Sequence, residues 1–336
     1  MSFKVTLAPS GHSFEVEEGE VVLDAAIRHG LSLQYGCRNG VCGACKGKVV
    51  EGEIRYDNGL PGAISEAEDA VGQVLLCSAK AASDLVVEAH EIGSSAEVPV
   101  RKMPARVAKM ERLAEDVMRL FLKLPDNERL QFLAGQYLDI LLPDGRRRAF
   151  SMANPPHDDA LVELHVRRIE GGEFTGHVFE TMQEKDILRI EGPYGTFTLQ
   201  EDSKRPMIFV AGGTGLAPIK AIIEHAIQEG AVRPMHLYWG VRSKADLYLQ
   251  ALPERWAQHD HISYTPVLSQ PLPADQWQGR SGLVHEAVLQ DFEDLFNYDV
   301  YASGPPAMVE AVRQGVTLKG LAGQHFFFDS FEFAAT

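Results

Sequence analysis

The chain has 336 residues, of which 45% are hydrophobic and 24% charged, and this globular composition excludes a disordered chain or a fibrous repeat. Its formal net charge of -15 argues against nucleic-acid binding, which needs clustered lysines and arginines. No apolar run reaches about 18 residues, and the N-terminus does not follow a signal-peptide pattern. We therefore expect a cytoplasmic protein of two or three domains that does not enter a membrane.

The N-terminal part of the chain predicts a small sheet and one helix. Residues 3–7 and 13–16 alternate polar and apolar side chains around a turn, which is typical of a β-hairpin. Residues 22–29 carry apolar side chains at helical spacing, and a glycine follows as a C-terminal cap. Residues 93–104 lack periodicity and hold two prolines, so we expect a linker there, after a first domain that covers residues 1–92.

The rest of the chain predicts two further domains of different architecture. Short alternating segments separated by turns predict an antiparallel β-barrel over residues 105–202. These segments are 105–110, 117–124, 137–142, 161–168 and 187–190. Beyond them, strands alternate with helices, which predicts a doubly wound parallel sheet over residues 203–336. Its elements are the strands 207–210, 235–239 and 298–302 and the helix 218–228.

The four cysteines of the chain lie close together in the first domain. Cys37, Cys42, Cys45 and Cys77 follow the spacing C-x4-C-x2-C-x31-C, which is the plant-type [2Fe-2S] ligand pattern. Glycines between them allow a loop tight enough for backbone N–H groups to reach the sulfur atoms. Four thiolates also make structural zinc sites, although these usually pair two C-x2-C motifs, and a disulfide framework would scatter its cysteines. The first 90 residues resemble a plant-type ferredoxin, which implies a β-grasp fold and a one-electron [2Fe-2S] cluster.

A four-residue segment in the proposed barrel resembles a flavin-binding motif. Arg148-Ala149-Phe150-Ser151 is similar to the R-x-Y-S motif of the ferredoxin-NADP reductase superfamily. The resemblance implies that Arg148 pairs with the flavin pyrophosphate, that the Phe150 ring packs along the flavin, and that the Ser151 hydroxyl lies near flavin N5. Phe150 replaces the usual tyrosine, which keeps the ring and loses a hydroxyl.

Two later segments extend the resemblance. His165-Val166-Arg167 matches the next flavin-contacting strand of the superfamily. The segment from Gly172 to Thr175 resembles the turn that holds the pyrophosphate at the start of a helix, which favours FAD over FMN. His165 equally fits a histidine packed in a strand, and we assign it no proton-transfer role.

A glycine-rich turn between a strand and a helix points to a nicotinamide nucleotide. Glycines let the backbone approach a pyrophosphate, and proline suits the first helical turn. The turn differs from the G-x-G-x-x-G fingerprint and resembles the G-G-T-G-x-x-P loop of the same reductases. The residues that the resemblance assigns to nucleotide binding are Gly212, Gly213, Thr214, Gly215 and Pro218.

The choice between NADH and NADPH depends on residues that follow the strand 235–239. Asp246 could accept a hydrogen bond from a ribose 2′-OH, which favours NADH. Arg242 or Lys244 could instead meet the 2′-phosphate of NADPH. We favour NADH.

Two C-terminal segments resemble the family's reacting centre. Ser303-Gly304-Pro305 begins a segment similar to the C-G-P-x-x-M loop below the nicotinamide, with serine in place of the usual cysteine. Asp329-Ser330-Phe331 resembles the stretch that places an aromatic ring beside the flavin, whereas we expect the three preceding phenylalanines to pack in the core. The resemblance therefore puts Ser151, Ser303 and Phe331 at the reacting centre.

Over nearly the whole chain, the three domains resemble an iron-sulfur flavoprotein reductase. The resemblance implies that electrons pass from NADH through FAD to the [2Fe-2S] cluster and on to a redox protein that docks at the ferredoxin domain of a monomeric chain. The first 100 residues hold fifteen acidic and seven basic side chains, which predicts salt-sensitive docking on a positively charged partner. The same carboxylates also fit an ordinary solvated surface.

Three classes of function remain at this stage. The main expectation is the reductase component of an oxygenase of the phenol, toluene or methane monooxygenase kind. A second class resembles CDP-6-deoxy-3,4-glucoseen reductase, which supplies electrons to a sugar dehydratase, and residues 35–46 and 101–104 look closest to it. The third class is a redox sensor or storage protein without turnover, and a general NAD(P)H flavin reductase is a simpler alternative to all three.

Overall fold

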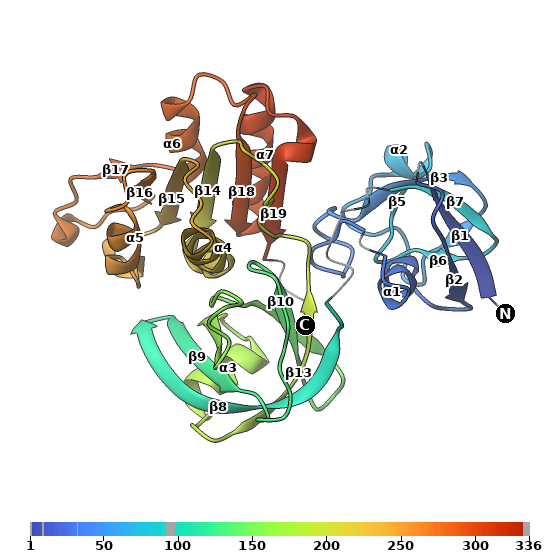
Figure 1. Cartoon of the computed structure of the whole chain (residues 1–336), viewed down its shortest axis with the longest axis horizontal. Helices are drawn as coiled ribbons and strands as arrows, with labels where there is room; N and C mark the ends of the chain where they lie inside the picture. Colours follow the sequence, from blue (N-terminus) through green and yellow to red (C-terminus); the bar gives the residue numbers. More distant parts are fainter. Residues whose placement is uncertain (1, 9, 32, 90, 92–97, 332–336) are drawn as a thin grey trace. The chain divides into compact units, whose positions relative to one another are not determined.

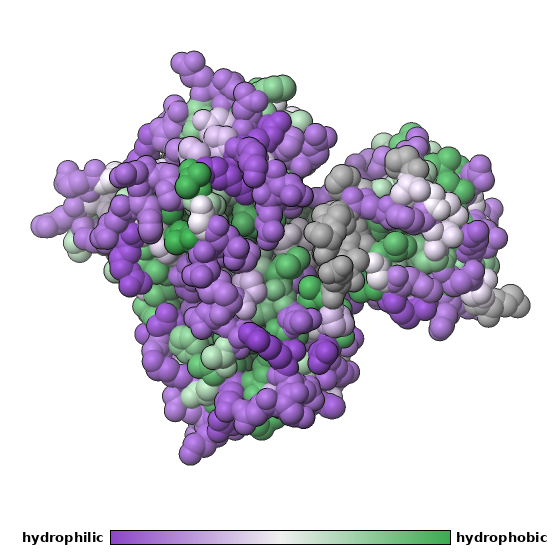
Figure 2. Space-filling model, viewed as in Figure 1, coloured by the Kyte–Doolittle hydropathy of each residue, from purple (hydrophilic) through white to green (hydrophobic). Residues whose placement is uncertain are grey.

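A computed structural model of the chain describes residues 2–8, 10–31, 33–89, 91 and 98–331. These residues form two compact units, one that ends at Pro99 and one that runs from Val100 to Phe331 (Figure 1). Hydrophilic side chains cover most of the surface seen in Figure 2. Within the described ranges, no helix combines the length and the apolar character needed to cross a lipid bilayer.

The first unit is built on a mixed five-stranded sheet with the order β2-β1-β7-β3-β5. Its strands are β1 (Ser2–Ala8), β2 (Ser13–Glu17), β3 (Lys46–Glu51), β5 (Gln73–Leu75) and β7 (Leu85–Glu88). β1 runs parallel to β7, and the other neighbouring pairs are antiparallel. The helices are α1 (Val22–Arg28) and α2 (Glu66–Asp69), and β4 (Ile54–Arg55) pairs with β6 (Lys80–Ala81). The predicted hairpin, helix and β-grasp fold are confirmed.

The second unit begins with a six-stranded antiparallel sheet of order β11-β10-β13-β8-β9-β12. Its elements are β8 (Arg101–Ala114), β9 (Val117–Lys123), β10 (Tyr137–Leu141), β11 (Arg147–Ser151), β12 (Val162–Arg167), β13 (Ile187–Tyr194) and the helix α3 (Glu173–Glu180). An antiparallel bridge between Met152 and Leu164 joins the two outer strands, so the strongly curved sheet closes into the expected barrel (Figure 1).

The barrel begins earlier than the sequence pattern predicts. β8 starts at Arg101, where residues 101–104 pair with Arg189–Gly192 of β13, so the last four residues of the expected linker belong to a strand. Only Met103 of these four is buried, and Pro104 lacks a backbone N–H. Residues 101–104 therefore show no alternation of apolar side chains that would predict a strand. They are a strand because they pair with residues of β13 that lie 85 or more positions further along the chain.

The rest of the second unit is a parallel sheet of order β17-β16-β15-β14-β18-β19. Its strands are β14 (Met207–Gly212), β15 (Met235–Val241), β16 (Ile262–Leu268), β17 (Arg280–Ser281), β18 (Asp299–Gly304) and β19 (Phe326–Ser330). Its helices are α4 (Leu216–Gln228), α5 (Ala251–Trp256), α6 (Val284–Asp291) and α7 (Pro306–Leu318). Successive residues of β14 enter opposite cores: Phe209 packs with α4 and α5, and Val210 with α6 and α7. The expected doubly wound sheet is confirmed.

The three phenylalanines of β19 behave as the sequence predicts. Phe326 is buried in the core beneath α6 and α7, and its ring stacks on Phe328 at 5.6 Å. Phe327 points to the other face, where its ring stacks on Tyr301 at 4.8 Å. The strand therefore fixes the backbone that follows it, including Asp329, at the carboxyl end of the sheet.

Candidate functional site

The loop between α1 and β3 carries three of the four cysteines, and the fourth follows β5. Cys45 and Cys77 are buried, whereas Cys37 and Cys42 are half-buried, and all four thiols are free of disulfides. The thiols interact in two pairs, Cys37 with Cys42 and Cys45 with Cys77. Hydrogen bonding to Cys42 lowers the pKa of Cys37 to about 6, and bonding to Cys45 lowers the pKa of Cys77. The same interactions and burial raise the pKa of Cys42 and of Cys45. Two pairs of neighbouring thiols match the two irons of a [2Fe-2S] cluster.

Backbone groups around the cysteines fit the same cluster. The N–H groups of Cys37 and Ala44 point at the Cys42 sulfur, at N to Sγ distances of 3.4 and 3.5 Å. Gly40 has a φ of +82°, and a Cβ atom there would lie 2.8 Å from the Ser78 hydroxyl oxygen.

The expected flavin motif lies on β11, at the edge of the barrel. Phe150 packs its ring against Phe174 of α3 at 5.4 Å between centroids. The half-buried Arg148 donates one bond to the neighbouring carbonyl of Arg147. Ser151, at the end of β11, is buried, and its hydroxyl bonds to the Asp329 carboxylate at 2.9 Å. The motif thus reaches from the barrel to the parallel sheet.

The second expected flavin segment caps the helix α3. Gly172 is the N-cap residue, and the Thr175 hydroxyl closes the turn through bonds to the carbonyl of Gly172 and the backbone of Ile169. A Cβ atom on Gly172 would lie 2.5 Å from this hydroxyl, so only glycine fits the turn as it stands. The segment therefore has the helix-start geometry that suits a pyrophosphate.

The strand β12 places its three expected residues in different surroundings. Val166 is fully buried in the barrel core. Arg167 donates to Asp116 at 2.8 Å and also lies against the glycine loop, since a Cβ atom on Gly213 would come within 2.6 Å of its guanidinium. The His165 ring is buried and hydrogen-bonded on both nitrogens, so its side chain is not directed at a bound group.

The glycine loop follows β14 and packs against the loop after β18. Residues Gly213–Gly215 form a 3₁₀ turn, and α4 begins directly after it with Pro218 buried in the first turn. A Cβ atom on Gly215 would lie 2.0 Å from the Ser303 carbonyl oxygen. Gly304 has a φ of +138°, and a Cβ atom there would lie 2.8 Å from the Gly212 carbonyl oxygen. The two loops touch backbone to backbone at the carboxyl ends of adjacent strands, which is where parallel sheets bind nucleotides.

The three residues expected at the reacting centre lie near the carboxyl ends of β18 and β19. The Ser151 hydroxyl donates to the Asp329 carboxylate, and Ser303 of β18 is the register neighbour of Asp329 in β19. The Phe331 backbone N–H donates to the Gly304 carbonyl at 2.9 Å. The Ser303 hydroxyl is fully buried and has no hydrogen-bond partner among the described residues.

Asp329 is a residue to which sequence reasoning assigned no role. Its carboxylate joins the flavin motif to the nicotinamide-side sheet, although 178 residues separate it from Ser151. The only signal in the sequence was its place beside Phe331, since a carboxylate in a C-terminal strand carries no pattern of its own.

The residues expected to select the nucleotide lie after β15. Asp246 accepts from the backbone N–H and the hydroxyl of Ser243, at 2.8 and 3.0 Å, and so closes its own turn. Arg242 is exposed and forms ion pairs with Asp116 at 3.5 Å and with Asp246 at 4.0 Å. The structure therefore places both residues together, on one turn after β15.

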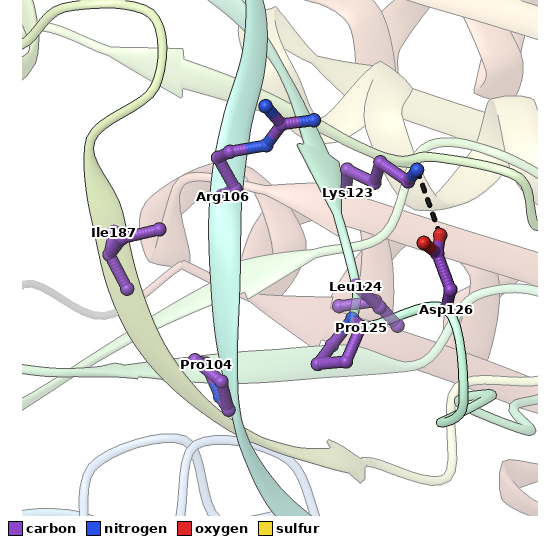
Figure 3. Close-up of a pocket in the computed structure, with 7 residues that line it drawn as sticks. All are labelled: Pro104, Arg106, Lys123, Leu124, Pro125, Asp126 and Ile187. Carbon is purple, nitrogen blue, oxygen red and sulfur yellow. Dashed lines mark ion pairs between the residues drawn. The ribbon is translucent and has the colours of Figure 1, made fainter.

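A separate pocket of about 280 Å³ lies on the barrel, lined by residues of β8, β9, β13 and the segment after β9. Figure 3 shows Pro104, Leu124, Pro125 and Ile187 around it, with Arg106 and the ion-paired Lys123 and Asp126 at its rim. None of the residues expected at the cofactor sites lines this pocket.

Taken by fold and site, the chain is a modular electron-transfer flavoprotein: a tetracysteine β-grasp domain, a barrel with a flavin motif and a parallel sheet with a nucleotide loop. The sequence matches the 2Fe-2S iron-sulfur cluster binding domain over residues 5–82, the oxidoreductase FAD-binding domain over 104–199 and the oxidoreductase NAD-binding domain over 209–314. The chain therefore belongs to the iron-sulfur flavoprotein NAD(P)H reductases, and its cofactors are a [2Fe-2S] cluster, FAD and a nicotinamide nucleotide.

Full-length relatives share this organisation. The chain is 37% identical to the CDP-6-deoxy-L-threo-D-glycero-4-hexulose-3-dehydrase reductase of Yersinia pestis, over 98% of this chain and 99% of the relative. It is 36% identical to DmpP, the reductase component of phenol 2-monooxygenase from Pseudomonas sp. strain CF600, over 100% and 96%. Among solved structures, the Amycolatopsis cytochrome P450 reductase GcoB matches with a TM-score of 0.83 and 33% identity, over 99% of this chain and 100% of GcoB. The predicted activity, an oxidoreductase that transfers electrons from a nicotinamide through flavin to the cluster, is confirmed.

Proposed function

We propose that the chain is the NADH-dependent reductase component of an oxygenase system, and that its cluster passes electrons to the oxygenase protein. The observation that carries the reacting-centre part of the proposal is the hydrogen bond from Ser151 of the flavin motif to Asp329, which neighbours Ser303 in the parallel sheet. Relatives named as reductase components of phenol and terephthalate oxygenases, at 36 to 37% identity over almost the whole chain, support the kind of partner.

The chain's own residues bind and orient the cofactors in this proposal. Arg148 and the turn at Gly172 would hold the FAD pyrophosphate. Phe150 and the backbone of His165, Val166 and Arg167 would line the flavin, and the Ser151 hydroxyl would lie near the reacting nitrogen. The bound FAD supplies the exchange between two-electron and one-electron chemistry. The Asp329 carboxylate keeps the Ser151 hydroxyl oriented, because that hydroxyl is its hydrogen-bond donor.

On the nucleotide side, the glycine loop and the residues next to it would bind the dinucleotide. Gly212, Gly213, Thr214, Gly215 and Pro218 form the loop and helix start that meet the pyrophosphate. Gly304 and Pro305 continue the floor of the site, while the buried Ser303 hydroxyl meets the nicotinamide. Arg242 and Asp246 stand where the adenosine ribose would lie, and we favour NADH because Arg242 is already paired with two carboxylates. No general acid or covalent nucleophile is required, since the cofactors carry the chemistry.

The acceptor docks at the ferredoxin domain, residues 1–92, while 101–202 and 203–336 form the flavin and nicotinamide domains of a cytoplasmic monomer. The first 100 residues hold eight more acidic than basic side chains, so a partner with a basic surface is steered to them. Because the cluster ligands belong to the same part of the chain, docking there shortens the last electron-transfer step.

An anaerobic titration with NADH, followed by visible absorption and electron paramagnetic resonance, tests the proposed electron path. We expect the flavin absorbance to bleach and a reduced iron-sulfur signal to grow with each addition of NADH. Bleaching without a cluster signal would contradict the path and favour a simple flavin reductase. Repeating the titration with NADPH checks the preference, because we expect it to need a much higher nucleotide concentration.

A second candidate acceptor is favoured by a specific observation. The relative from Yersinia pestis, named as a dehydrase reductase for a CDP-hexulose, covers the chain as fully as the oxygenase reductases do and is 37% identical. A purified oxygenase component and a purified sugar dehydratase component, each offered to the reduced protein, separate the two. The partner that accepts electrons at a rate proportional to its concentration identifies the function.

A further inference from the structure

A buried polar network crosses the seam between the flavin barrel and the nicotinamide domain. Its centre is Lys220 of α4, which is 6% exposed. The Nζ atom of Lys220 lies 3.0 Å from the Ala153 carbonyl, 3.0 Å from Glu163 Oε2 and 2.9 Å from Glu224 Oε2. An ammonium group has three donors, so every donor of this buried cation is used. Two of the three acceptors belong to the barrel.

The network continues through β12 back to the nicotinamide domain. Glu163 Oε1 lies 2.9 Å from His165 Nε2, and His165 Nδ1 lies 3.1 Å from the Tyr248 hydroxyl. Burial lowers the pKa of His165 and raises that of Tyr248, so the imidazole is neutral and the phenol keeps its proton. Tyr248 then donates to Nδ1, and Nε2–H donates to Glu163. The nicotinamide domain therefore contacts β12 at two points: Lys220 binds Glu163, and Tyr248 binds His165.

Tyr248 and Lys220, at the two ends of the network, both lie next to segments that are expected to bind the cofactors. Tyr248 packs edge-on against Trp239, whose indole N–H donates to the Gly213 carbonyl at 2.9 Å. Lys220 stands in the second turn of α4, the helix that the glycine loop starts. Its barrel partner Ala153 is two residues beyond Ser151, and the Ala153 N–H donates to the Glu163 carbonyl at 2.8 Å.

We propose that Lys220 is a positioning residue for hydride transfer, because it locks the flavin strand β12 and the segment after Ser151 to the helix of the nucleotide loop. Glu163 and Tyr248 complete the lock. The inference rests on the proposed electron path and adds to it the residues that set the distance between flavin and nicotinamide before the nucleotide arrives. None of the three side chains needs to touch either cofactor.

The substitution Lys220→Met tests the proposal, since it keeps the length of the side chain and removes the charge. We expect the limiting rate of flavin bleaching at saturating NADH to fall about 10- to 100-fold, while the apparent dissociation constant for NADH changes less than about 3-fold, because a small misplacement is felt in the chemical step. Lys220→Arg should recover part of the rate. Hydrogen exchange of the β12 and α4 amides should become faster in Lys220→Met, a readout that is independent of turnover.

Arg233→Met is the matched control. Arg233 pairs with Asp299, a buried carboxylate, at 3.4 Å, and donates to the backbone carbonyls of Gln200, Ser203 and Arg205. None of these contacts involves β12 or α4, the two elements that Lys220 joins. We expect this variant to lose stability and to keep the limiting rate within about 3-fold of the wild type. If Lys220→Met and Arg233→Met lowered the rate equally, the effect would be one of stability and the proposal would be overturned.

Two milder variants cover the case in which Lys220→Met does not fold. Tyr248→Phe removes one hydroxyl and Glu163→Gln keeps the shape of the side chain, and each should lower the limiting rate with little change in NADH affinity. Wild-type rates and exchange in both variants would also overturn the proposal. Failure of NADH to bleach the wild-type flavin would instead defeat the proposed electron path, and the exchange experiment would still decide whether Lys220 locks the seam.

Discussion

At the residue scale, the buried hydroxyl of Ser303 lowers the stability of the folded chain. This hydroxyl is fully buried and has no hydrogen-bond partner within the described ranges of the chain. A buried hydroxyl without a hydrogen bond costs about 1–3 kcal/mol. The register neighbours of Ser303 in the adjacent strands are Ala211 and Asp329.

Ser303→Ala is therefore expected to raise the free energy of unfolding by about 1 kcal/mol, because it removes the unsatisfied group without leaving a large cavity. The same variant should slow bleaching of the flavin by NADH if the hydroxyl meets the nicotinamide. Urea unfolding and rapid mixing measure the two effects. A clear loss of stability would mean that the hydroxyl has a partner in solution.

The cysteine pairs allow a second prediction at this scale. Cys77→Ser removes one thiolate of the Cys45 pair, so we expect loss of the iron-sulfur absorption and of bound iron, because a [2Fe-2S] cluster needs all four ligands. Reduction of FAD by NADH should continue, since its residues lie in the other unit. Iron analysis and an NADH titration check both parts, and Ser78→Ala, which removes the neighbouring hydroxyl only, is the control.

At the scale of elements, β12 carries both a barrel core and an interdomain contact. Leu164 and Val166 are fully buried in the barrel, while Glu163 and His165, on the other face, meet the nicotinamide domain. Burial by itself would raise the pKa of Glu163, but the His165 hydrogen bond and the Lys220 charge outweigh it and hold the pKa at about 2. The ionised carboxylate is therefore stabilised by the fold.

This shift makes a pH prediction with a definite sign. The pKa of Glu163 is lower in the folded chain than in the unfolded chain, so its contribution is complete above the unfolded value of about 4.3 and is lost as the pH falls towards 2. Between about pH 6 and pH 3.5, wild-type stability should drop about 1 kcal/mol more than that of Glu163→Gln. Urea unfolding at the two pH values measures the difference, and equal drops would contradict it.

At the scale of the whole molecule, the charge is unevenly distributed along the sequence. The first 100 residues contribute -8 to the net charge of -15, although they are less than a third of the chain. Salt screens attraction between separate molecules over about 8–10 Å, but it has little effect on electron transfer inside one protein. Docking and internal transfer are therefore distinguishable by their response to salt.

We expect the second-order rate of reduction of cytochrome c, used as a basic one-electron acceptor, to fall several-fold between about 50 and 300 mM salt. The rate of flavin bleaching by NADH should change little over the same range. Stopped-flow absorption measures both steps. A salt-independent reduction of cytochrome c would mean that these carboxylates are only a solvated surface.

Much of the architecture was predictable because it is encoded locally. The spacing of Cys37, Cys42 and Cys45 within nine residues specifies the ligand loop by itself, and the glycines beside them permit its turns. The strand, glycine turn and helix at 207–228 follow one another directly, so their order alone predicted the nucleotide loop. The start of β8 at Arg101 was not predicted, because residues 101–104 pair with β13 without an alternating pattern of apolar side chains.

The sequence by itself thus determined the three domain types, the cluster ligands and the segments that meet each cofactor, because each depends on neighbours in the chain. Only the tertiary structure decided that Asp329 meets Ser151 from 178 residues away, and that Lys220 meets Glu163 from 57 residues away. These contacts depend on strand order and on the seam between two domains. Neither contact produces a recognisable pattern in the sequence, because each needs only a single residue from each of two distant segments and the packing that surrounds them.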